Sequence, residues 1–202
     1  MTKIVGITGG IGSGKTTFSN HLKKLGFLVH ESDRVVSEIY TKPKKQFLSF
    51  IKEKISQDAI NHNKINKAEI ANVIFNNNTI KRLLERRIHK EVQNSREAFI
   101  KKHTKKKKKI IFADIPLLFE NKLEKNFDLV ICIISTKKNR TKRVLKNKKF
   151  TKENLNKIFK AQITDKERKK RSQIIINNNK TKKDFIFIVE KVLKGLIKWE
   201  KL

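Results

Sequence analysis

The sequence predicts an α/β protein, built on an open parallel sheet of five strands and interrupted by an all-helical insertion. Three observations predict this class. Five short apolar runs alternate with segments whose apolar residues recur at helical spacing. A glycine-rich stretch separates the first of these runs from a helical pattern. A long middle stretch has helical spacing and no strand signal.

Each strand is predicted from a short apolar run. Residues 3–8 (KIVGIT) and 27–32 (FLVHES) are the first two, and a helical pattern follows each of them. Residues 110–113 and 129–134 are apolar throughout, which is typical of strands buried on both faces of a parallel sheet. Residues 174–176 predict the last strand.

The helices are predicted from apolar residues three and four positions apart. Phe18, Leu22 and Leu25 form such a pattern, and Gly26 closes it. Further helices outside the middle segment are predicted at residues 33–40, 137–145, 154–163 and 185–196.

The middle of the chain predicts a separate helical domain. From residue 43 to residue 102 the apolar positions indicate three helices. We therefore place an inserted helical domain at residues 42–107, and the sheet core at residues 1–41 and 108–202. A basic helical segment at about residues 138–171 precedes the last strand, and we expect it to form a lid.

Composition excludes several classes of protein. The 202 residues are 37% hydrophobic, which is enough for one core, and no run is long enough to span a membrane. Cys132 is the single cysteine and lies in an apolar strand, so we expect a buried thiol and no disulfide. The N-terminus lacks a signal-peptide cleavage site. These features predict a cytoplasmic protein without a membrane partner.

The formal net charge of +31 has two explanations. Clustered cations bind nucleic acids by releasing counterions. However, the chain has 41 Lys against 9 Arg, together with 18 Asn and 27 Ile, a set whose codons are rich in A and T. The cations are also dispersed and lack interleaved aromatic residues. We expect a base-composition effect and no specific nucleic-acid partner.

The strongest signal is the sequence GGIGSGKT at residues 9–16, which fits G-x-x-x-x-G-K-[ST] between a strand and a helix. Glycines allow successive backbone N–H groups to surround a phosphate, and the helix adds a partial positive charge. Lys15 would reach the β- and γ-phosphates, and the Thr16 hydroxyl would bind Mg²⁺. The motif predicts a P-loop NTPase fold of three layers. The predicted nucleotide-binding residues are Gly10, Ile11, Gly12, Ser13, Gly14, Lys15, Thr16 and Thr17.

Two carboxylates follow strands at the edge of the sheet where open α/β folds bind ligands. Asp33 lies two residues after Glu31, at the end of the second strand, and could accept the proton of an attacking hydroxyl. Alternatively, Ser32 or Asp33 caps the following helix. Asp114 follows the third strand, where P-loop enzymes often keep an Asp near Mg²⁺, or it serves a turn before Pro116.

Three arginines stand out in a chain that otherwise uses lysine. Arg140, Arg143 and Arg168 lie in the segment before the last strand. Because the planar guanidinium fork suits phosphate oxygens, they indicate a lid that closes over a phosphate. The alternative is a solvated basic face.

Several segments together resemble the dephospho-CoA kinase family. They are TGGIGSGKTT at residues 8–17, Glu31-Ser32-Asp33, IPLLFE at residues 115–120 and Ala161-Gln162. The resemblance extends over nearly the whole chain. It includes His89 in the helical insertion, which resembles that family's substrate-binding domain. The chain departs from the family's usual Arg-Asp at Asn147-Lys148.

The resemblance implies ATP-dependent phosphorylation of the 3′-hydroxyl of dephospho-CoA to give coenzyme A, with ATP and Mg²⁺ as cofactors. It implies Asp33, Lys15 and Arg143 as catalytic residues, with Arg140 and Arg168 as further lid positions. Thr8, Asp33 and His89 would bind dephospho-CoA, and Thr16 and Asp114 the metal. We expect a monomer, with weak self-association as the alternative. The competing functions are another P-loop kinase of a nucleoside monophosphate or small metabolite, and a basic nucleic-acid-binding module.

Overall fold

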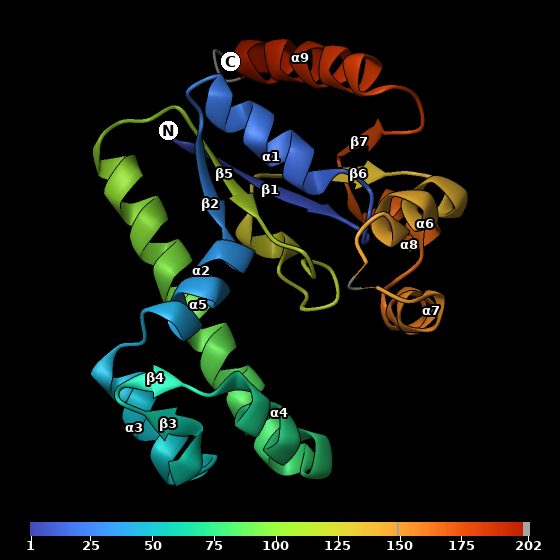
Figure 1. Ribbon diagram of the computed structural model, residues 1–202. Helices are drawn as coiled ribbons and strands as arrows, with labels where there is room; N and C mark the ends of the chain where they lie inside the picture. The colour runs from blue at the N-terminus through green and yellow to red at the C-terminus, as the bar shows by residue number, and fades with distance from the viewer. Residues whose placement is uncertain (149, 200–202) are drawn as a thin grey trace. The chain divides into compact units, whose positions relative to one another are not determined.

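The structure is a computed structural model of the chain that describes residues 1–148 and 150–199 (Figure 1). Contacts divide the chain into two units. The first comprises Met1–Glu31 and the chain from Ile100 onward, and the second is Ser32–Phe99. The sequence placed the insertion at residues 42–107. The second unit begins earlier because Ile39 and Tyr40 pack against its hydrophobic core.

The first unit is built on a five-stranded parallel sheet in the order β2-β5-β1-β6-β7, which confirms the predicted fold class. The carboxyl ends of the strands meet at one edge. Glu31 is opposite Asp114, and Gly9 is opposite Ile133. The strands are β1 (Lys3–Gly9), β2 (Leu28–Glu31), β5 (Ile110–Asp114), β6 (Leu129–Ile134) and β7 (Ile174–Asn177).

Helices and loops cover both faces of this sheet. On one face, Phe18 and Leu22 of α1 (Lys15–Lys24) pack with Phe185 and Val189 of α9 (Lys182–Trp199) against the strands, and the two helices lie together in Figure 1. The other face is covered by the chain after β5, whose Leu118 and other apolar residues form a second cluster. The remaining elements here are η2 (Glu124–Asn126), α6 (Lys137–Leu145), α7 (Lys152–Ala161) and α8 (Asp165–Arg171).

The second unit is helical with one exception. Its core contains Phe47 and Ile51 of one helix and Leu84 of another. The elements are α2 (Ser32–Thr41), α3 (Lys45–Lys54), η1 (Gln57–Ala59), β3 (Ile60–Asn61), β4 (Lys64–Ile65), α4 (Lys67–Asn76) and α5 (Asn78–Lys105), whose last turns belong to the first unit.

The expectation of an all-helical insertion was therefore incomplete. Strands β3 and β4 pair as an antiparallel hairpin, with Ile60 opposite Ile65. Its two turn residues, His62 and Asn63, have φ of 48° and 60°. Two consecutive residues with positive φ match the twist of a two-residue hairpin turn, and Asn tolerates this conformation. Two-residue strands are too short to leave an alternating pattern in the sequence.

Cys132 is fully buried in β6, as predicted. Burial raises the pKa of its thiol to about 11, against a smaller opposing effect of Arg168. The thiolate is the nucleophilic form, so the thiol is inert at neutral pH. Among the helices that the structure describes, none combines the length and apolar character needed to cross a bilayer.

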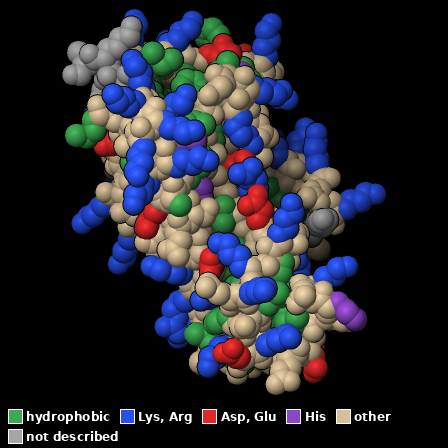
Figure 2. Space-filling view, turned by 90° about the vertical axis from the view of Figure 1, so that its left-hand side faces the viewer, with side chains coloured by type: hydrophobic (Ala, Val, Ile, Leu, Met, Phe, Trp, Pro, Cys, Tyr) green, Lys and Arg blue, Asp and Glu red, His purple; other side chains and the backbone are tan. Residues whose placement is uncertain are grey.

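Basic residues are spread over the face that Figure 2 shows. In Figure 2, Lys and Arg side chains are scattered over the visible face, with acidic side chains among them. The longest lysine run, residues 105–109, is exposed at the end of α5 and in the turn before β5.

Candidate active site

The glycine-rich loop, residues 9–16, joins the carboxyl end of β1 to α1. Gly14 precedes the helix with φ 107° and ψ 14°, a left-handed conformation that favours glycine. The side-chain amide of Asn178 donates to the carbonyl oxygen of Ser13 at 2.7 Å and occupies the space that a Cβ on Gly14 would need. The chain after β7 thus holds the loop in place.

Lys15 and Asp114 form an ion pair beside this loop. The Ser19 hydroxyl donates to the second oxygen of the same carboxylate at 2.6 Å. The side chains of Lys15 and Asp114 are only 12% and 8% exposed, so solvent screens their attraction weakly. Because its carboxylate binds Lys15 and Ser19, Asp114 belongs to the loop site rather than to a turn before Pro116.

The candidate metal ligands are hard oxygen donors. Thr16 is exposed in the first turn of α1, and Asp114 ends the neighbouring strand. Mg²⁺ prefers oxygen ligands and is commonly held by one or two side chains together with substrate phosphates and water. In the part of the chain that the structure describes, no group of three His, Cys, Asp or Glu side chains could hold a metal. The residues fit a magnesium ion that arrives with a nucleotide.

Arg143 lies in α6 and its guanidinium is surrounded by protein acceptors. It donates to the carbonyl of Asn178 at 2.8 Å, to that of Gly12 at 3.3 Å and to the Ser135 hydroxyl at 3.2 Å. Arg143 therefore ties three segments together: the glycine-rich loop, the end of β6 and the chain after β7. The predicted lid arginine therefore contacts protein groups in all three segments.

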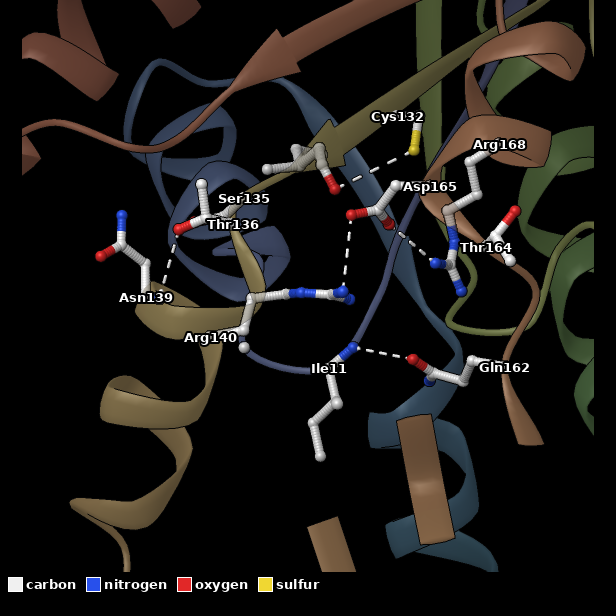
Figure 3. A network of polar contacts seen from close by, with 12 residues as sticks. Ile11, Cys132, Ser135, Thr136, Asn139, Arg140, Gln162, Thr164, Asp165 and Arg168 are labelled. Atoms are coloured by element: carbon white, nitrogen blue, oxygen red, sulfur yellow. Dashed lines mark hydrogen bonds and ion pairs between the residues drawn. The ribbon is translucent and has the colours of Figure 1, made fainter. Parts of the chain in front are cut away.

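Arg140 and Arg168 face the loop from the segment between β6 and β7. Figure 3 shows both guanidinium groups on the two sides of Asp165. Arg140 lies 3.4 Å from one Asp165 oxygen, and Arg168 donates to the other at 3.0 Å. A Cβ on Gly10 would overlap Arg140, so only glycine allows this approach of the guanidinium to the loop.

The two arginines differ in how well protein groups neutralise them. Arg168 is 1% exposed and also pairs with Glu120 at 3.1 Å. Arg140 has Asp165 as its single acidic partner in the described chain, and its Nε is buried without a hydrogen-bond partner there. The pKa of Arg140 is lowered, chiefly because burial disfavours its charged form. Asp165 opposes this effect, and the charge of Arg168 adds to it. Arg140 is therefore the arginine here that would gain most from an anion.

Asp33 is exposed in the first turn of α2, two residues after the end of β2. The Ser32 hydroxyl is buried without a hydrogen-bond partner in the described chain. No hydrogen bond to the Asp33 carboxylate occurs among residues 1–148 and 150–199. The capping explanation of these two residues therefore fails, and the Asp33 carboxylate is available to a ligand.

The two other predicted substrate-binding residues have different environments. Thr8 is 1% exposed, and its hydroxyl donates to the carbonyl of Pro116 at 3.4 Å. Burial and this hydrogen bond attach Thr8 to the chain after β5, and its role in substrate binding stays a prediction. His89 is exposed in the second unit, in an open hollow of about 430 Å³ that also includes Arg82 and Arg86.

Sequence reasoning missed Ser19 and gave Asn178 no role. Ser19 lies inside α1 and has no sequence signal, because the partner that defines it is 95 residues away. Asn178 is the middle residue of three consecutive asparagines just after the last strand. Polar residues at the carboxyl end of a parallel strand are a signal that could have found it.

Comparisons with known proteins agree with one another. The family model described as dephospho-CoA kinase matches residues 3–184. The dephospho-CoA kinase of Fusobacterium nucleatum is 32% identical over 190 residues, covering 93% of this chain and 95% of that protein. The Buchnera aphidicola enzyme of the same name is 35% identical over 187 residues, covering 89% and 85%. The structure of dephospho-CoA kinase from Campylobacter jejuni matches with TM-score 0.75 and 25% identity, covering 98% of both chains.

Proposed function

The chain belongs to the dephospho-CoA kinase family, and from this premise we propose how its own residues bind the substrates and support the transfer. The protein is a kinase that uses ATP to phosphorylate dephospho-CoA, giving coenzyme A. The observation that carries the proposal is the ion pair of Lys15 with Asp114 beside the glycine-rich loop. Release of ADP that depends on dephospho-CoA tests it.

We assign the triphosphate of ATP to the loop and to Lys15. Backbone N–H groups of residues 10–17 would surround the phosphates, and the Lys15 ammonium would contact the β- and γ-phosphates. When bound, Mg²⁺ supplies charge neutralisation between these phosphates. Thr16 and Asp114 are the residues that would hold it. Ser19 then keeps the Asp114 carboxylate oriented, since its hydroxyl already donates to one oxygen.

Arg140 is assigned to the transferring phosphoryl group. Its charge is the less neutralised of the two arginines that face the loop, and its buried Nε has no hydrogen-bond partner in the described chain. In such a transfer the negative charge spreads over the phosphoryl oxygens, and a positioned guanidinium stabilises it. Arg168, paired with Glu120 and Asp165, would hold the lid segment in its place.

The second unit is assigned to dephospho-CoA, with Asp33 beside the reacting hydroxyl and His89 as a substrate contact. The 3′-oxygen attacks the γ-phosphorus, the bond from that phosphorus to the bridging oxygen breaks, and ADP leaves. The Asp33 carboxylate accepts the hydroxyl proton. We also propose a cytoplasmic monomer without a specific nucleic-acid partner, in line with the single buried thiol and the scattered cations.

Arg143 is proposed to position the loop rather than to contact the phosphoryl group. Replacing it by lysine keeps the charge but removes the fork that bonds Gly12, Ser135 and Asn178. We expect the free energy of unfolding of Arg143→Lys to fall by about 1–3 kcal/mol, since buried acceptors lose their donors. KM for ATP should rise more than kcat falls. Urea unfolding and steady-state kinetics measure these changes.

The matched control is Lys142→Ala, which removes an exposed cation from the next position of the same helix. The control should change neither the free energy of unfolding nor KM for ATP. For Arg143→Lys, a fall of kcat by more than about 100-fold at unchanged stability would contradict the positioning role. A loss of that size is typical of donors that stabilise charge in the transition state, and would indicate a direct contact with the transferring group.

A further inference from the structure

Two segments that carry the family resemblance, residues 115–120 and 161–162, have no assigned contact with a substrate in the account above. They meet in the first unit. One oxygen of Glu120 accepts a hydrogen bond from the backbone N–H of Ile163 at 3.2 Å and from Arg168 at 3.1 Å. The turn between α7 and α8 is therefore attached to the chain that follows β5.

The same turn reaches the glycine-rich loop through Gln162. Its side-chain oxygen accepts a hydrogen bond from the backbone N–H of Ile11 at 3.1 Å, as Figure 3 shows. A backbone N–H can only donate, so the end of the amide that faces it must be the oxygen. The backbone N–H of Gln162 ends α7 by donating to Ile158. The base of the side chain is thus fixed while its amide lies on the loop.

This contact uses a group that a phosphate would need. Ile11 is within the loop whose N–H groups are assigned to the triphosphate, and here a side-chain oxygen takes its hydrogen. Among the residues that the structure describes, the Gln162 side-chain nitrogen has no hydrogen-bond partner. A Cβ on neighbouring Gly10 would lie 3.3 Å from both the Gln162 oxygen and an Arg168 nitrogen. The Gln162 amide therefore lies close to the Arg168 guanidinium and to backbone N–H groups of the glycine-rich loop.

We propose that Gln162 is a phosphate-binding residue whose side-chain amide flips when ATP binds. In the structure its oxygen accepts from the backbone N–H of Ile11. When a phosphate oxygen takes that hydrogen, rotation of the amide by about 180° about its last torsion presents the nitrogen as a donor to the same phosphate oxygen. The turn between α7 and α8 keeps one bond to the loop site in both states. This inference rests on the placement of the triphosphate at residues 10–17.

Glutamine is suited to this exchange because it is uncharged and carries a donor and an acceptor on one side chain. A carboxylate would hold the Ile11 N–H equally well but would repel the phosphate. A methionine has a similar length but neither a comparable acceptor nor a donor. Substitution by glutamate therefore keeps the acceptor for Ile11 and removes the donor to phosphate, whereas substitution by methionine removes both.

The test is the affinity for ATP, measured by isothermal titration. For Gln162→Met we expect the dissociation constant to rise about tenfold, as for loss of one hydrogen bond to a charged group. The matched control is Gln173→Met, because the Gln173 oxygen also accepts from a backbone N–H, that of Val130 at 2.8 Å, at the amino end of β6. This control should bind ATP within about twofold of the parent, because it keeps every loop contact.

Gln162→Glu should leave the melting temperature of the ATP-free protein near that of the parent, and should weaken ATP binding more than Gln162→Met does. If Gln162→Met binds ATP as tightly as the parent, or more tightly, Gln162 only covers the loop and the inference falls. Failure of the parent itself to bind ATP would instead overturn the placement of the triphosphate.

A measurement on the unaltered protein covers the case in which Gln162→Met does not fold. In the ¹⁵N-labelled parent, the Gln162 side-chain amide signal can be assigned from its loss in Gln162→Glu. We expect its hydrogens to exchange with solvent more slowly once ATP is bound, since a phosphate then accepts from them. An unchanged rate of hydrogen exchange at saturating ATP would contradict the proposed flip of the amide.

Discussion

Lys15→Ala is expected to remove turnover, with a loss in kcat of about 10³-fold or more, comparable to the loss of other single groups that stabilise transition-state charge. Lys15 is the cation assigned to the β- and γ-phosphates. Its removal also leaves the Asp114 carboxylate, 8% exposed, without its ionic partner and close to the phosphates. The measurement is steady-state ADP release with ATP and dephospho-CoA, with thermal unfolding to verify that the variant folds.

Lys23→Ala is the matched control for this variant. Lys23 lies in the same helix and also pairs with a carboxylate, Glu31, at 2.8 Å, but its side chain is 40% exposed. Because exposed pairs contribute little, the control should keep the parent's turnover within about twofold. A folded Lys15→Ala protein that retains a tenth of the parent's kcat would contradict the assignment of Lys15.

Asp33→Asn is expected to lower kcat by about 10²–10⁴-fold, the range for loss of a general base. Asparagine keeps the shape of the side chain but cannot accept the hydroxyl proton as a carboxylate does. Because Asp33 is assigned to the acceptor hydroxyl and to no contact with ATP, the dissociation constant of ATP should stay within about twofold of the parent's. Single-turnover kinetics and ATP titration separate the two effects.

Glu38→Gln provides the control for Asp33→Asn. Glu38 is an exposed carboxylate of the same helix, and its partner is Arg34 at 3.6 Å. Its replacement changes the charge of α2 equally but removes no group assigned to the reaction. Equal losses in the two variants would point to helix charge, and a kcat of Asp33→Asn within threefold of the parent would remove Asp33 from the role of base.

Local patterns predicted the sheet because its strands are short apolar runs, separated by segments whose apolar residues recur at helical spacing. Residues 110–113 and 129–134 became the central strands β5 and β6, and the glycine-rich stretch joins β1 to α1 as expected. The hairpin of β3 and β4 escaped prediction, because two residues per strand cannot establish a period of two. Its stability comes from the turn at His62 and Asn63 and from packing of Ile60 and Ile65 on the second unit's core.

The roles of individual side chains were less accessible, since partners distant in sequence define them. Arg143 was predicted at a phosphate, yet its acceptors include the Gly12 carbonyl, 131 residues away. Thr8 was predicted at the substrate, and the structure shows its hydroxyl donating to the carbonyl of Pro116, a contact that no local pattern indicates. In contrast, the proximity of Lys15 and Asp114 could be expected from the sequence, because Lys15 follows β1, Asp114 ends β5, and both strands end at the same edge of a parallel sheet.

The most direct measurement follows ADP release from Mg-ATP with the parent protein, using dephospho-CoA and, in parallel, AMP as the acceptor, with the product identified by mass. The account predicts ADP release that requires dephospho-CoA and yields coenzyme A, with no comparable release when AMP replaces it. ADP release with AMP but not with dephospho-CoA, or a protein that binds ATP and phosphorylates neither, would contradict it.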